Sequence, residues 1–223
     1  MSSTNVPDAL FEALERAKIK PEATGRTLLM LSGGLDSTAL LVALLEHTQH
    51  AVHAHHIELS NREGRAPAEI RALERIYAWC DRNERSFERS QSTNEFPLGT
   101  GGGWDTTLSL FIASRVCHAL RNQVQLVVTG HIRPAFNELT EGEAVFHAAF
   151  ISRVRRPRWI RPLAFLEGTQ AERKAAIRDS MGPELVEATW WCRRPRGDDR
   201  DQPCGECHAC KGMVKAAELG HRG

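Results

Sequence analysis

The chain has 223 residues, of which 41% are hydrophobic and 26% are charged, and its formal net charge is +1. Such values are typical of a globular protein with one full core, and the small net charge excludes a global field that would draw the chain to nucleic acid or to membranes. No segment approaches the roughly 18 apolar residues of a membrane span, and the first residues lack the apolar run of a secretory signal. We therefore expect a cytoplasmic protein without a membrane partner, in which cysteine thiols stay reduced.

Apolar periodicity predicts that strands and helices alternate along most of the chain. In chain order we expect a helix at 8–18, a strand at 27–31, a helix at 38–46, a strand at 51–59, helices at 67–80 and 105–120, and a strand at 124–129. The spacing of Thr169 and Glu172 is that of a capping box and predicts the start of a later helix. This alternation predicts an α/β fold, a Rossmann-like parallel sheet with helices on both faces.

A phosphate-binding loop is predicted directly after the strand at 27–31, in the segment Ser32-Gly33-Gly34-Leu35-Asp36-Ser37-Thr38. The glycines permit positive φ and let backbone amides approach an anion, and the start of the next helix supplies unpaired N–H groups. Asp36 would repel a bare phosphate, so it indicates a bound Mg²⁺ or another positioned polar contact. Such a turn can also simply cap a helix, but its place between a buried strand and a helix favours phosphate binding.

A metal site is predicted near the carboxyl end, where four of the six cysteines gather: Cys192, Cys204, Cys207 and Cys210. The C-x2-C-x2-C spacing of the last three lets their thiolates converge on one ion, and Cys192 completes a closed, structural four-cysteine Zn²⁺ site. A ligand role for His208 and an iron–sulfur cluster remain alternatives. Because the composition changes at this point, we expect a nucleotide-binding domain at 1–188 and a zinc-binding element at 189–223.

The loop resembles the SGGxDS signature of the PP-loop ATP pyrophosphatases, and together with the terminal C…CGxCxxC pattern it resembles the 7-cyano-7-deazaguanine synthases. Three further segments are similar to that family: 108–113, 161–163 and 189–192. The resemblance implies an ATP-dependent carbon–nitrogen ligase that forms AMP and pyrophosphate. Such an enzyme adenylates a 7-deazaguanine carboxylate and converts it with ammonia to an amide and then a nitrile, as part of queuosine biosynthesis. It also implies a homodimer.

The resemblance assigns site residues by position. Asp36 and Ser37 are the expected catalytic residues, and the whole segment from Ser32 to Thr38, with Gly130 after the strand at 124–129, is expected to bind ATP and Mg²⁺. The expected substrate-binding residues are Trp104, Asp105, His131 and Phe136. Most of these differ from the family pattern, and Gln170 stands where the family has a lysine, which removes an expected phosphate-contacting cation.

Two alternative functions remain open from the sequence. A PP-loop enzyme that modifies tRNA, or another macromolecular acceptor, could hold RNA through the arginine-rich segments 153–161 and 193–200, although the net charge is weak for that role. A catalytically silent nucleotide-binding module would agree with Gln170 but not with the intact loop. Nitrile formation, salt-dependent tRNA binding, and ATP binding without AMP formation would separate the three functions.

Overall fold

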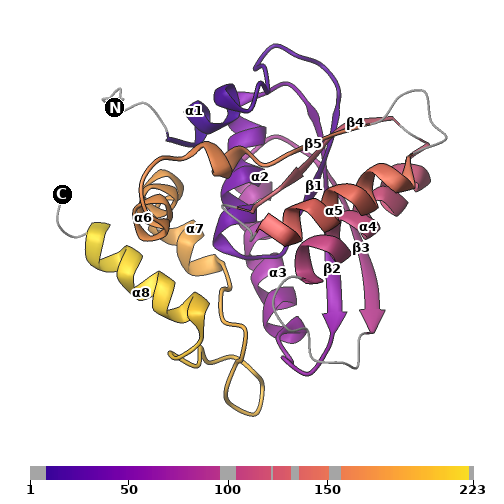
Figure 1. Cartoon of the computed structure of the whole chain (residues 1–223). Helices are drawn as coiled ribbons and strands as arrows, with labels where there is room; N and C mark the ends of the chain where they lie inside the picture. Colours follow the sequence, from indigo (N-terminus) through magenta and orange to yellow (C-terminus); the bar gives the residue numbers. More distant parts are fainter. Residues whose placement is uncertain (1–8, 96–103, 122, 132–135, 151–156, 221–223) are drawn as a thin grey trace, which may run out of the picture.

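A five-stranded parallel sheet forms the centre of the protein (Figure 1). The computed structural model describes residues 9–95, 104–121, 123–131, 136–150 and 157–220. The strand order is β3-β2-β1-β4-β5, and each neighbouring pair is parallel. The strands are β1 Arg26–Met30, β2 Ala51–Ser60, β3 Glu88–Glu95, β4 Val124–Thr129 and β5 Arg158–Ile160.

Helices cover both faces of the sheet, as the sequence predicted. They are α1 Ala9–Arg16, α2 Leu35–His47, α3 Ala66–Asn83, α4 Trp104–Ala119, α5 Phe136–Ala149, α6 Gln170–Met181, α7 Pro183–Ala188 and α8 His208–Gly220, with a 3-10 helix η1 at Pro162–Phe165. Because side chains alternate along a strand, Leu28 of β1 packs toward α4 and α5, whereas Leu29 packs into the larger core with α1, α2, α3 and α6. Each face therefore has its own apolar core.

The predicted elements are all present, with small differences at their ends. The helix after the phosphate loop begins at Leu35, three residues before its predicted start. The capping box at Thr169 is formed by both of its hydrogen bonds. Two further strands, β3 and β5, and helices α5, α7 and α8 were not predicted from the apolar pattern.

The loops after β1 and β4 meet at the point where the chain changes direction across the sheet. The chain runs from β1 outward through β2 to β3, and then returns to place β4 on the other side of β1. Ligands of open α/β sheets bind at such a switch point, beyond the carboxyl ends of the strands. Gly130, directly after β4, lies so close to the start of α2 that an added Cβ would be 2.9 Å from the Ser37 nitrogen. Only glycine fits there.

The carboxyl-terminal segment packs back onto the sheet domain. α8 lies beside α6 (Figure 1), and its Met213 joins the larger apolar core. Between α7 and α8 the described chain contains one short antiparallel bridge, Arg196 to Gln202, and three of the four cysteines, while Cys210 lies in the first turn of α8.

Arg85 fastens the end of α2 to the start of β2. Its guanidinium donates hydrogen bonds of 2.8–3.2 Å to four backbone carbonyls, those of Leu44, Leu45, Thr48 and His50. A cation suits the negative end of a helix dipole. We expect Arg85→Met to lower the free energy of unfolding by about 2 kcal/mol in urea titrations. Arg62→Met, at an exposed position, is the matched control, and an equal loss in both variants would contradict this role.

Candidate functional site

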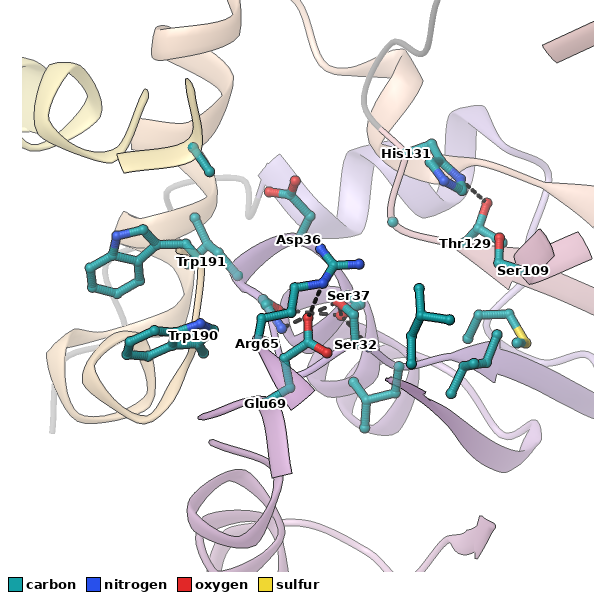
Figure 2. Close-up of a pocket in the computed structure, with 18 of the residues that line it drawn as sticks. Ser32, Asp36, Ser37, Arg65, Glu69, Ser109, Thr129, His131, Trp190 and Trp191 are labelled. Carbon is teal, nitrogen blue, oxygen red and sulfur yellow. Dashed lines mark hydrogen bonds and ion pairs between the residues drawn. The ribbon is translucent and has the colours of Figure 1, made fainter. Parts of the chain in front are cut away.

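The phosphate loop places the polar side chains of Ser32, Asp36 and Ser37 near one another after β1 (Figure 2). Gly33 adopts φ +75°, which favours glycine, and the Ser32 and Ser37 hydroxyls lie 3.0 Å apart. Gly34 is the N-cap of α2 and provides no side-chain cap, so the first N–H groups of the helix are left for the loop. Thr38 is buried, and its hydroxyl donates to the Gly34 carbonyl at 2.8 Å, so it braces the loop from behind rather than facing the cavity.

Asp36 is paired with a lysine that the sequence did not predict. Lys174 of α6 places its Nζ 3.1 Å from both carboxylate oxygens of Asp36. Burial raises the pKa of the Asp36 carboxyl, and Lys174 opposes that rise. Since Lys174 lies one helical turn after Gln170, the expected loss of a cation at Gln170 is compensated on the same helix.

The loop opens into a cavity of about 320 Å³. Its apolar wall comes from the ends of β1 and β2 and from α4, with Met30, Leu31, Ile57, Leu59 and Leu108. The opposite wall contains Trp190 and Trp191, which lie beside Arg65 and Glu69 in Figure 2. This size and mixture of apolar and polar groups suit a small planar ligand together with phosphate groups.

A charged network closes the cavity on the α3 side. The Arg65 Nε lies 3.2 Å from Glu69 and 3.3 Å from Glu63, and the Arg193 Nε lies 3.6 Å from Glu63. Burial raises the pKa of Glu69, and Arg65 opposes that rise. A role in the site was not predicted for Arg65 or Glu69, because their sequence pattern is that of an ordinary solvent-facing helix start.

His131 lies in the cavity wall, as predicted from its position after β4. Its Nδ1 is 2.9 Å from the Thr129 hydroxyl and its Nε2 is 3.1 Å from the Thr106 hydroxyl. Burial, with a contribution from Arg161, lowers the pKa of His131 to about 4. The ring is therefore neutral at pH 7. The side chains of the other predicted substrate residues, Trp104, Asp105 and Phe136, lie outside the described part of the structure.

Two buried, neutral histidines make the stability of the fold depend on pH. Burial lowers the pKa of His55 to about 4 as well, so both His55 and His131 bind protons more weakly in the folded chain than in the unfolded chain. The contribution of these neutral rings to the free energy of unfolding is fully present above pH 6.5, and it is lost as the pH falls from 6.5 toward 4. For buried His55 we expect a loss of about 2 kcal/mol by pH 5. Urea titrations at pH 7.5 and 5 should show a smaller loss in His55→Gln, and an unchanged loss would contradict this source.

The four cysteines converge at the edge of the cavity. Their Sγ atoms all lie within 4.8 Å of one another. The backbone N–H of Cys204 donates to the Cys192 Sγ at 3.2 Å, and that of Cys207 donates to the Cys204 Sγ at 3.3 Å. Such N–H donors favour thiolates, and the backbone donors to the Cys204 Sγ, that of Cys207 first, lower the pKa of Cys204 to about 6. The four residues therefore fit a metal ion, and His208, which is exposed, does not belong to the group.

The cysteine cluster is joined directly to the phosphate loop. The Trp190 N–H donates to the Gly33 carbonyl at 2.8 Å, and the Trp190 indole N–H donates to the Cys192 carbonyl at 2.8 Å. Cys192 itself lines the cavity. The four-cysteine cluster therefore adjoins the candidate nucleotide site.

The fold of this protein has a similar counterpart among solved structures. No protein-family model matches the chain, and no curated protein matches it. Among solved structures, the chain is similar to the U34-tRNA thiolase NcsA from Methanococcus maripaludis with its 4Fe–4S cluster. The alignment has 12% identity and a TM-score of 0.51, and it covers 96% of this chain and 78% of the thiolase. The likeness is one of fold.

This comparison confirms the predicted α/β fold, a parallel sheet with helices on both faces. A likeness of fold at 12% identity does not show the expected 7-cyano-7-deazaguanine synthase family. Within the described residues, no helix has both the length and the apolar character of a membrane span.

Proposed function

We propose that this protein cleaves ATP between its α- and β-phosphates and transfers AMP to an oxygen of a nucleobase-like acceptor. The observation that carries the proposal is the Asp36–Lys174 pair, held at the phosphate loop where the cavity opens. A loop that only capped a helix would not need a half-buried lysine from a distant helix to hold its aspartate.

The loop residues supply charge stabilisation rather than a covalent nucleophile. The α2 N–H groups and the Ser32 and Ser37 hydroxyls would hold the phosphate oxygens, and Lys174 would balance the charge that develops on the departing pyrophosphate. Mg²⁺ would arrive with ATP, since both oxygens of Asp36 are already bound to Lys174. Preorganised groups of this kind act without moving during the reaction.

A tRNA base is the acceptor that the fold favours. The similar structure belongs to an enzyme that acts on tRNA. Exposed arginines follow the cavity residue Arg193 along the chain, namely Arg194, Arg196 and Arg200, and they would offer phosphate contacts, although Arg196 is paired with Glu206 at 2.9 Å. AMP on a base oxygen would then leave when a sulfur or nitrogen nucleophile attacks the ring carbon.

A free 7-deazaguanine carboxylate with ammonia as nucleophile is the second candidate. The four-cysteine pattern and a cavity of about 320 Å³ favour it, since that volume encloses a small molecule together with part of ATP. The two acceptors share the first step, so the loop chemistry is the same for both.

For the cysteine cluster we propose a single structural Zn²⁺. A tetrahedral zinc site with Zn–S bonds of about 2.3 Å holds its sulfurs about 3.8 Å apart, close to the spacing within 4.8 Å in this protein. An iron–sulfur cluster places several irons between its cysteines and holds them farther apart. Metal analysis and the ultraviolet–visible spectrum of the purified protein separate the two, because only the cluster absorbs visible light.

The experiment supplies ATP and Mg²⁺ with either unmodified tRNA and sulfide or 7-carboxy-7-deazaguanine and ammonia. Chromatography measures AMP against ADP, and mass spectrometry follows the acceptor. We expect AMP and pyrophosphate to appear with tRNA and not without an acceptor. AMP with the deazaguanine alone would select the second candidate. ATP binding without AMP, or formation of ADP, would contradict the proposed function.

A further inference from the structure

A chain of hydrogen bonds runs along β2 and β3 from the cavity to the surface. His55, which lines the cavity, has its Nδ1 2.7 Å from the Ser90 hydroxyl. Ser90 is in turn 2.6 Å from the His53 Nε2, and the His53 Nδ1 is 3.0 Å from Glu88. At the cavity end, the His55 Nε2 is 3.1 Å from the Ser92 hydroxyl, and Asn94 donates to that hydroxyl at 3.2 Å.

Parallel pairing explains why these side chains alternate so regularly. The register places His53 opposite Glu88 and His55 opposite Ser90, so the inward-facing residues of the two strands interleave. His53 and His55 are buried, whereas the Glu88 side chain is 52% exposed. The two rings thus lie inside the protein, and the Glu88 end of the chain is in contact with solvent, where Arg26 also donates to the Glu88 carboxylate at 3.0 Å.

With both rings neutral, the two ends of the chain fix the direction of every hydrogen bond in it. The Glu88 carboxylate can only accept, so the His53 Nδ1 must carry a proton, and the Nε2 of a neutral His53 then accepts from Ser90. Ser90 then accepts from the His55 Nδ1, and the His55 Nε2 accepts from Ser92. The Asn94 amide nitrogen can only donate, so the other end demands the same direction.

We propose that this chain is an ordered proton path from the cavity to the surface, built from Ser92, His55, Ser90, His53 and Glu88. In this path each ring carries a single proton, on its Nδ1. The low pKa of His55, caused first by burial and then by His53 and His56, agrees with a neutral ring at pH 7.

The path supplies what the second step of the proposed function requires, and its use in catalysis rests on that function. When a nucleophile H–X attacks the adenylated carbon, the C–X bond forms, the C–O bond breaks, and AMP leaves with the electron pair. The proton of X passes to the Ser92 hydroxyl, the hydroxyl proton of Ser92 passes to the His55 Nε2, and the Nδ1 proton of His55 passes to Ser90. Ser90 protonates the His53 Nε2, and the His53 Nδ1 proton reaches Glu88, which releases it to water.

The order of the chain can be tested without turnover. Nitrogen-15 NMR of histidine-labelled protein distinguishes the two neutral tautomers, and His53→Gln and His55→Gln assign the signals. We expect the Nδ1–H tautomer for both rings, although neutral imidazole in water favours the other one. An Nε2–H tautomer at either ring would overturn the proposed path, and this holds whether or not the proposed function is right.

The transfer itself is tested by single-turnover AMP release with the substrate that proves active. Ser90→Ala should slow this step about 10²-fold, added imidazole should restore much of the rate, and wild-type protein should be insensitive to imidazole. Ser90→Thr keeps the hydroxyl and should remain within a few-fold of wild type. A slow Ser90→Ala variant that imidazole does not restore would show a purely structural chain. Absence of AMP from wild-type protein would contradict the proposed function, while the tautomer result would still decide the path.

Discussion

Asp36→Asn is expected to lower the rate of AMP formation by roughly 10²-fold or more, with unchanged metal content. The substitution removes the charge that holds the Lys174 ammonium at the loop, so the cation no longer sits where the pyrophosphate leaves. Stability changes through two opposed effects. A neutral amide removes the cost of the buried Asp36 charge, whose pKa burial raises, but it leaves the half-buried Lys174 ammonium without its carboxylate partner. Pyrophosphate release and urea midpoints measure activity and stability separately.

The partner variant makes this test specific. Lys174→Met should reduce AMP formation to a similar extent, and the double variant should be no slower than either single variant, because both remove the same pair. Lys20→Met, at an exposed position before β1, whereas the loop follows β1, is the control for loss of a lysine. Full activity in Asp36→Asn would contradict the role assigned to the loop.

Cys207→Ser is expected to remove the bound metal and to weaken ATP binding together. A closed thiolate site supplies much of the folding free energy of a small element without a core of its own. When that element loosens, the Trp190 N–H bond to the Gly33 carbonyl is lost, and the loop loses its brace. We expect the dissociation constant for ATP to rise about tenfold, which corresponds to one hydrogen-bonded contact of roughly 1.4 kcal/mol.

Isothermal calorimetry and metal analysis of the same samples check this coupling. His208→Ala changes an exposed neighbour of Cys207 outside the four-cysteine group, and it should keep both metal and ATP affinity. Loss of metal in that variant would make His208 a ligand. A metal-free Cys207→Ser protein that still binds ATP with full affinity would show that the cluster and the loop are independent.

The sequence could predict the elements whose apolar pattern is strong. β1, β4 and α2 are nearly continuous apolar runs, and the glycines between β1 and α2 mark the loop. β3 escaped prediction because it is polar throughout, and its pairing depends on histidines of β2 that lie about 35 residues earlier. β5 has only three residues and lies in an arginine-rich stretch, where charge masks the strand pattern.

The site was predictable only where it is local in sequence. The loop residues and the four cysteines are contiguous or closely spaced, so their motifs show them directly. Lys174 reaches Asp36 across 138 residues, and no local spacing indicates that contact. The same is true of Arg65 and Glu69, which become cavity residues only because α3 packs beside the loop.

The two edges of the sheet affect how this protein can associate. Unpaired strand edges invite pairing with other chains, and proteins oppose this with short or charged edge strands. β5 is too short to be a good template, and the exposed residues of β3 are Arg89, Gln91, Thr93 and Glu95, besides Glu88. Both edges therefore disfavour aggregation through sheet extension. A homodimer of this chain would have to form through its helices and not by continuing the sheet.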